Sequence, residues 1–416
     1  MTKILVYKND PWINRAIALS VTRKKKPIEE IIKECEMAGV EECKKYVQRI
    51  VRAPADNPPG KGFGHRIGIE FGDTLLIINP SRFEALRIWR EANALNGIRI
   101  SGLERSLRIQ KPPFECIDRE SKYLHDLALP VYEEFVKKGI AEEDARFLLP
   151  EGVKTTIILD ASANRVRDLA KLANSLGDFP LKEEDELKSS LLERVIEEIG
   201  FVPNERSLSE WPFEMSFEWW KKKVKYGKGN KQISSPLFSC MLDLDLDGSL
   251  SMYAQAVRLR QGLVMIEPVT SIARRRKFEV PPSFGEGERK EYYRIAKEAC
   301  DIQEAKLEEL DATYVYSLLL GQKARGKFYV NAAHAPYIVM QRACGAAQWE
   351  IRSKLGIPLY EKLKEEENVG PRCMVIGECW EPQTSRCPLA REPWRYRERK
   401  QVVEKLRVSS QEFDVP

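Results

Sequence analysis

The N-terminal half of the chain combines short apolar runs with longer stretches of helical periodicity. Residues 3–7 are mainly apolar, apolar residues alternate from Ile67 to Phe71, and Leu75 to Ile78 continues that pattern, so these segments are predicted strands. Helices are predicted near 27–51, 80–91, 119–138, 141–148 and 162–175, with a further strand from 155 to 159. This order predicts an α+β layout around one small sheet.

The second half repeats the same order of elements. Leu242 to Gly248 alternates leucine and aspartate, which predicts a strand with one solvated face. An arginine-containing segment follows at 249–260, then helices near 288–309 and 311–321, a strand at 328–330 and a helix from 336 that continues through 352. Pro112 and Pro281 are 169 positions apart, and so are Ser162 and Asn331. The constant offset predicts an internal duplication.

A length of 416 residues exceeds what one hydrophobic core usually supports. The predicted fold class is α+β, with two tandem copies of one domain, each a small, mostly antiparallel sheet with long helices. The copies are expected at 1–177 and 233–367. Residues 178–232 are interpreted as a charged linker with its own helices, and 368–416 as a cysteine-containing tail.

Composition and charge narrow the class of protein. Hydrophobic residues make up 43% and charged residues 31%, as in a soluble globular enzyme. No apolar run approaches membrane-spanning length and no signal peptide is evident, so no membrane partner and a cytoplasmic location are expected. The net charge of +5 comes from intermixed signs, which argues against a nucleic-acid surface. Basic clusters at 23–26 and 274–277 still suit small phosphate ligands.

Two patterns resemble metal sites but are incomplete, so no metal site is predicted. Asp243, Asp245 and Asp247 match the opening of an EF-hand loop, but Ala254 occupies the position that requires a bidentate glutamate. Nine cysteines, an odd number, indicate reduced thiols more than a disulfide framework. The tail cysteines at 373, 379 and 387 are one ligand short of a zinc site, which would need a distant fourth donor.

Several strings resemble signature stretches of the flavin-dependent thymidylate synthases. Asp144 to Pro150, followed by Lys154 and Thr155, resembles one of them, and Ala347 to Arg352 resembles another. Gln255 to Arg260 is similar to the Gln-x-x-Arg-His-Arg opening of the family's main motif. Gly62 to His65 resembles the segment whose histidine lies at the flavin.

The resemblance implies a reaction in which the cofactor supplies most of the chemistry. Family members use FAD, NADPH and methylenetetrahydrofolate to convert dUMP to dTMP, so dUMP and folate are the implied partners. The implied catalytic residues are Arg258, Arg260 and Arg342. The implied cofactor-binding residues are His65, Arg258, Arg260 and Asn331, and the implied substrate-binding residues are Arg146, Gln255, Ser271, Arg274 and Arg342. Arginine suits these roles because its planar fork binds phosphate and carbonyl groups.

The family builds its sites between the subunits of a homotetramer. A chain with two copies is therefore expected to form a homodimer that reproduces four domains, a pseudo-tetramer. The expected site is composite, because His65 and Arg146 survive only in the first copy. The groups that survive only in the second copy are Gln255, Arg258, Arg260, Asn331 and Arg342.

The departures from the family pattern leave alternatives open. Leu259 replaces the motif histidine, Leu263 and Pro268 stand where serines belong, and Ser271 and Arg274 are displaced. The corresponding place in the first copy is interpreted as Asn79, Arg82 and Glu84. Arg146 also suits a helix cap, and the Trp349 segment also suits core packing. The expected function is therefore that of a thymidylate synthase. The alternatives are a flavin enzyme for another pyrimidine nucleotide and a non-catalytic nucleotide-binding homologue.

Overall fold

A computed structural model describes most of the chain, which divides into two compact units. The first unit comprises Met1–Asn57, Gly62–Glu210 and Glu286–Leu320, and the second comprises Pro58–Lys61, Trp211–Gly285 and Gly321–Pro416. No helix in the described ranges is long and apolar enough to cross a membrane. The described residues are 3–51, 70–92, 98, 100–105, 107, 110, 112–176, 179–200, 241–259, 262–332, 334–364, 369–371, 373–374, 387, 403–404, 406–409 and 411–416.

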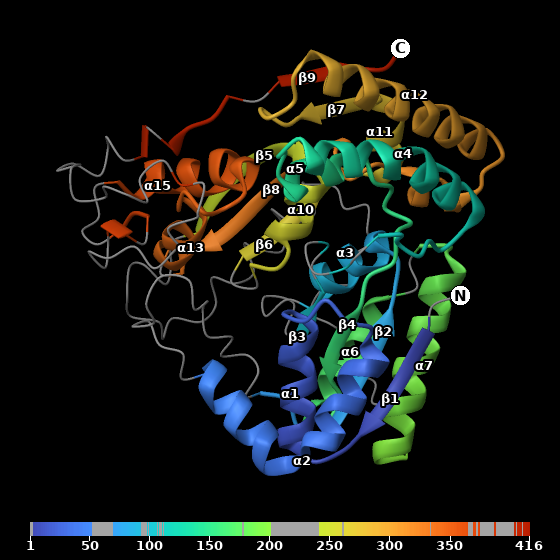
Figure 1. Ribbon diagram of the computed structural model, residues 1–416, viewed down its shortest axis with the longest axis vertical. Coiled ribbons are helices and arrows are strands. Elements are labelled where there is room, and N and C mark those ends of the chain that lie inside the picture. Colours follow the sequence, from blue (N-terminus) through green and yellow to red (C-terminus); the bar gives the residue numbers. More distant parts are fainter. Residues whose placement is uncertain are drawn as a thin grey trace. The chain divides into compact units, whose positions relative to one another are not determined.

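The first unit is built on an antiparallel four-stranded sheet of order β1-β2-β4-β3 (Figure 1). One face of β2 and β4, carrying Leu75, Ile77 and Ile158, forms a core with helices α1 and α2. The intervening Leu76 and Ile78 are also fully buried, as expected for a sheet covered on both faces. The bounds are β1 (Lys3–Lys8), α1 (Pro11–Val21), α2 (Ile28–Val51), β2 (Thr74–Asn79), β3 (Gly102–Glu104) and β4 (Ile157–Asp160).

The remaining helices of the first unit include a segment that the sequence assigns to a linker. Helix α7 packs on α6 and buries Leu187, Leu191 and Val195, which lie four residues apart on one helical face. It is therefore part of the first unit's core. The bounds are α3 (Arg82–Glu91), α4 (Arg119–Lys137), α5 (Glu142–Ala145), η3 (Arg146–Leu148), η4 (Ala163–Arg165), α6 (Val166–Ser175) and α7 (Lys182–Ile199).

Helix α12 (Glu286–Glu308) and η6 (Ala312–Ser317) also belong to the first unit, although the sequence assigns them to the second copy. Helix α12 packs on α4. Beyond η6, the Glu151 amide donates to the Leu318 carbonyl over 2.7 Å, and the Leu320 amide donates to the Leu149 carbonyl over 2.9 Å. This reciprocal pair of bonds ties the end of each helical segment to the other.

The second unit contains a three-stranded antiparallel sheet of order β5-β8-β6 and a separate β7-β9 pair. Along β5 the aspartates are exposed, while Leu244 and Leu246 are buried, which confirms the predicted strand with one solvated face. The bounds are β5 (Met241–Ser249), α10 (Leu250–Ala256), β6 (Gly262–Ile266), α11 (Val269–Arg275), β7 (Lys277–Val280), β8 (Lys323–Asn331), α13 (Ala335–Arg342), α14 (Trp349–Ile351), η7 (Arg352–Gly356), α15 (Ile357–Leu363) and β9 (Gln411–Asp414).

The two sheets share their order of elements and their register. The order β2-β4-β3 in the first unit corresponds to β5-β8-β6 in the second. Leu76 pairs with Leu159, and the residues 168 and 169 positions later, Leu244 and Phe328, also pair. A serine caps the helix after the first of these strands in each unit, because Ser81 accepts from the Glu84 amide and Ser249 accepts from the Met252 amide, each over 3.1 Å.

The α+β class is confirmed, and one detail of the prediction changes. The helix from residue 336 ends at Arg342 instead of continuing through Trp349. A turn that contains Gly345 follows, and the Gln348 side chain then caps α14 by accepting from the Ile351 amide over 3.1 Å. Ile67 and Ile69 of the predicted strand before β2 lie outside the described residues.

Candidate functional site

Helix α10 places two of the sequence-predicted site residues at its C-terminal end. Its N-terminus is held by Glu350, which accepts from the Ser249 amide over 2.6 Å and from the Ser249 hydroxyl over 2.5 Å. Glu350 is fully buried, and burial together with nearby Glu279 raises its pKa to about 7. Gln255 and Arg258 follow three residues apart, so they share one side of this segment.

Gln255 contacts the cap of a second helix. Its Nε2 donates to Oε1 of Gln348 over 3.4 Å, and Gln348 is the residue that begins α14. The Gln348 side chain is 6% exposed, and its own Nε2 is buried without a hydrogen-bond partner among the described residues. A buried amide donor with an unused hydrogen indicates a place for an oxygen acceptor.

Arg342, at the end of α13, brings a second guanidinium group close to Arg258. Burial lowers the pKa of Arg342, and repulsion from Arg258 lowers it further, while Tyr337 acts in the opposite direction. The Nε atom of Arg342 is buried and, within the described ranges, has no hydrogen-bond partner. Across the described parts of the chain, no carboxylate forms an ion pair with Arg342. Two neighbouring cations and an unused amide donor form a site suited to an anion.

In the first unit the corresponding arginines are neutralised by carboxylates of the same unit. Arg90 follows the capping Ser81 by nine residues, as Arg258 follows Ser249, and the Nε of Arg90 donates to Glu91 over 2.8 Å. Arg87, which matches Gln255, forms a buried ion pair with Glu184. At these two positions after the cap serine, the first unit therefore has arginines that are paired with carboxylates.

This correspondence corrects one assignment made from the sequence. Arg82 is the first residue of α3 and matches Leu250, so it does not occupy the place of Arg258. Its guanidinium lies 3.4 Å from the Glu104 carboxylate and donates to Gln110 over 3.0 Å. The matched position is Arg90, because the cap serine and not the spacing of arginines sets the alignment.

The structure brings together Gln255, Arg258 and Arg342 among the predicted residues. Asn331 ends β8 opposite Met241 on β5. Ser271 and Arg274 are exposed on α11 and, within the described residues, form no side-chain hydrogen bond or ion pair. The predicted residues His65 and Arg260 lie outside the described residues.

Arg146 lies in the first unit, where it begins η3. Its positive charge affects the pKa of Glu151, a side chain that is 1% exposed. Burial raises the pKa of Glu151 to about 8. Arg82 and Arg146 oppose this rise, while Glu104 reinforces it. The sequence did not single out Glu151, because a glutamate after a proline carries no periodic signal of burial.

The C-terminal cysteines give no ligand set within the described part of the chain. Cys373 and Cys387 are present as thiols, and Cys379 lies outside the described residues. No group of three or more His, Cys, Asp or Glu side chains is placed to hold a metal ion among the described residues. The Cys387 sulfur lies against Gly345, where a β-carbon would be 2.2 Å away, so this part of the tail packs on the turn before α14.

Comparison with known proteins supports the resemblance seen in the motifs. Residues 102–196 match the family model described as thymidylate synthase complementing protein. The matched segment runs from β3 to α7 in the first unit and contains Arg146. No curated protein matches the chain.

Proposed function

We propose that this chain, a relative of the flavin-dependent thymidylate synthases over residues 102–196, binds a pyrimidine nucleotide through the arginine pair of its second unit. The reaction that we propose is the reductive methylation of dUMP to dTMP, with methylenetetrahydrofolate as carbon donor and NADPH as reductant. The observation that carries the proposal is that Arg342 lies close to a second cation, Arg258. Among the described residues, no carboxylate forms an ion pair with Arg342.

The chemistry of the donor set supports a nucleotide ligand. Two guanidinium groups can bind the oxygens of a phosphate or a pyrimidine carbonyl with charge-assisted hydrogen bonds. The free Nε2 hydrogen of Gln348 adds a neutral donor for a carbonyl oxygen. Burial of the Arg342 Nε atom and of Gln348 excludes water from these donors, which strengthens each interaction with the bound group.

The same donors fit the cofactor that the family uses. Arg258 and Asn331 are the described residues that would hold FAD, and His65 and Arg260 would contribute from outside the described ranges. The buried Nε of Arg342, without a partner in the described part of the chain, leaves hydrogen-bonding capacity for an oxygen-rich ligand. When bound and reduced, the flavin supplies the hydride. The arginines bind and orient the anionic ligand and stabilise negative charge on it.

The architecture that we propose is a pair of duplicated domains that assemble as a homodimer. The shared strand order, the shared register and the two serine caps support the duplication. Two chains of 47.9 kDa would then supply four copies of the fold. Light scattering should give twice the chain mass, and a strictly monomeric, active protein would contradict this assembly. The composite site with His65 and Arg146 stays a prediction.

The test of function compares matched arginines in the two units. Arg258→Ala removes a charge-assisted contact and should weaken dUMP binding or turnover by about 2–4 kcal/mol. Arg90→Ala is the matched control, because Glu91 already neutralises Arg90. Binding is measured by calorimetry with dUMP, and turnover by NADPH-dependent release of tritium from C5-labelled dUMP. Equal losses in both variants, with unchanged thermal unfolding, would place the nucleotide site elsewhere.

A second candidate function rests on the altered segment after β6, which forms helix α11. Ser271 and Arg274 are exposed and form no described side-chain contact, although the family resemblance assigns them to the substrate. A changed α11 favours a different pyrimidine nucleotide, or nucleotide binding without turnover. A yellow protein that binds dUMP without releasing tritium would support this candidate over thymidylate synthesis.

A further inference from the structure

A cavity of about 420 Å³ lies in the first unit, at the end of the sheet where β2 and β3 finish and β4 begins. Its walls include Asn79 at the end of β2, Arg105 just after β3, and Thr155 and Thr156 just before β4. The volume falls within the range of small-molecule sites. Neither Arg258 nor Arg342 of the second unit is among the residues that line this cavity.

Basic residues outnumber acidic residues around this cavity. Lys25, Lys26, Arg105 and Lys154 line it, against Glu29 and Glu115. Lys26 is compensated by Glu30 over 2.9 Å and by Glu34. Lys25 is exposed and, among the described residues, forms no hydrogen bond or ion pair. The cavity therefore keeps a positive charge available to a ligand.

Arg105 holds the lysine segment against the sheet. It is 9% exposed, and its Nη2 donates to the carbonyls of Lys24 over 3.2 Å and Lys26 over 2.5 Å. The Thr155 hydroxyl in turn donates to the Arg105 carbonyl over 3.1 Å. The segment that carries Lys25 is thus fixed to the ends of β3 and β4, so the cavity is built before a ligand enters.

Two buried polar atoms in the cavity wall have no partner in the described part of the chain. They are the Nε atom of Arg105 and the Oδ1 atom of Asn79. Unpaired buried polar atoms cost free energy unless a ligand or water satisfies them. One is a cationic donor and the other an acceptor, a combination that matches a ligand with both an anionic group and a polar N–H or O–H group.

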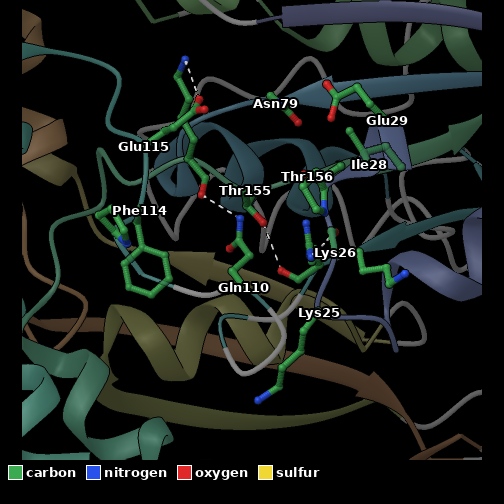
Figure 2. A pocket seen from close by; sticks show the side chains of 14 residues that line it. Lys25, Lys26, Ile28, Glu29, Asn79, Gln110, Phe114, Glu115, Thr155 and Thr156 are labelled. Atoms are coloured by element: carbon green, nitrogen blue, oxygen red, sulfur yellow. Dashed lines mark hydrogen bonds and ion pairs between the residues drawn. The ribbon is translucent and has the colours of Figure 1, made fainter. Parts of the chain in front are cut away.

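Part of the cavity lining is apolar. Figure 2 shows Gln110 between Phe114 and the Lys25–Lys26 segment, with Thr155 beside it. Gln110 is held by Arg82, which donates to its Oε1 over 3.0 Å, and by its own bond to the Lys154 carbonyl over 3.4 Å. Phe114 and Pro113 supply an apolar surface next to these polar groups. Such a wall suits the uncharged part of a small organic ligand.

We infer that this cavity binds a phosphorylated small molecule, with its phosphate at Lys25 and Arg105 and its uncharged part against Phe114. The ligand class is a phosphate monoester or diphosphate of a nucleoside-sized molecule. Lys25 and Arg105 bind the anionic group. The side-chain amides of Asn79 and Gln110 and the hydroxyl of Thr156 form hydrogen bonds with polar groups on the rest of the ligand. This inference does not depend on the proposed reaction of the second unit.

The test uses the full chain carrying Arg258→Ala and Arg342→Ala, so that binding at the second unit does not contribute. Inorganic pyrophosphate, UMP and uridine are titrated by calorimetry at low and high salt. Lys25→Glu should weaken pyrophosphate and UMP binding about tenfold or more, as expected for loss of a charged contact. Lys33→Glu, the same charge change at an exposed α2 position outside the cavity, should alter Kd less than twofold.

Localisation and ligand chemistry separate the outcomes. Bound UMP should slow backbone hydrogen exchange in peptides covering 25–29 and 154–156, and uridine should bind far more weakly than UMP. Equal weakening by Lys25→Glu and Lys33→Glu would show general surface attraction and overturn the inference. So would a chain that binds neither phosphate probe, or that binds uridine as tightly as UMP. A loss of dUMP turnover in Arg258→Ala alone bears on the proposed function and not on this cavity.

Discussion

Replacing Arg342 by methionine should stabilise the protein and abolish nucleotide binding at the same position. The structure gives Arg342 a buried Nε, a repulsive neighbour in Arg258, and no carboxylate partner among the described residues. An apolar side chain of similar length removes the desolvation cost and the repulsion. Exchanging buried charge for apolar volume is neutral or stabilising by roughly 1–4 kcal/mol, and the partial exposure of Arg342 favours the lower part of that range.

Arg87→Met in the first unit is the matched contrast. Arg87 is 1% exposed and forms an ion pair with Glu184, which is fully buried, so the substitution leaves a carboxylate without its cation. Breaking a buried pair in this way costs about 3–5 kcal/mol. The same chemical change should therefore have opposite signs in the two units.

Calorimetric thermal unfolding with and without dUMP measures both effects. Arg342→Met should raise the Tm by about 2–6 °C, following the usual relation between free energy and Tm for a unit of this size. Added dUMP should raise the Tm of the wild-type protein and leave that of Arg342→Met unchanged. If Arg342→Met lowers the Tm as Arg87→Met does, Arg342 has an internal anionic partner, and the argument for an anion site fails.

Three further predictions concern stability. Burial raises the pKa of Glu151 to about 8 from its ordinary value of 4.5, so between these pH values the folded state retains a proton that the unfolded state loses. The free energy of unfolding should therefore fall by up to about 1.4 kcal/mol for each pH unit in this range. Glu151→Gln should flatten this dependence in urea titrations, and an unchanged slope would contradict the prediction. Ser249→Ala removes the α10 cap and a hydrogen bond to buried Glu350, so urea unfolding should show a free energy of unfolding lower by about 2–3 kcal/mol. A decrease below about 0.5 kcal/mol would contradict this role of Ser249. Gly326→Ala would place a β-carbon 1.9 Å from the Met265 carbonyl oxygen, so it should destabilise the protein by about 3 kcal/mol in urea unfolding. Gly287→Ala is the control, because no atom lies within 4 Å of its β-carbon, and it should be nearly neutral in the same assay.

The amino-acid sequence alone determined the elements whose signal is local. Strict leucine–aspartate alternation was enough to predict β5, because a sheet strand with one solvated face requires period two. The long helices α4 and α12 followed from their apolar periodicity. Gln255 and Arg258 were identified because they lie within one short motif, where chain connectivity keeps them together.

Tertiary structure decided the features that depend on partners distant in sequence. Glu184 neutralises Arg87 across 97 positions, and no local pattern around Arg87 predicts this partner. Helix α12 joins the first unit because its apolar face packs on α4. Its apolar periodicity shows that one face is buried but does not show which unit buries it. Sequence periodicity reports which face of an element is buried, whereas the charge state of a site depends on which side chains fold back to meet it. The sequence therefore predicted the strand and the motif that carry Gln255 and Arg258, while only the folded chain showed the first-unit arginines paired with carboxylates and Arg342 beside another arginine.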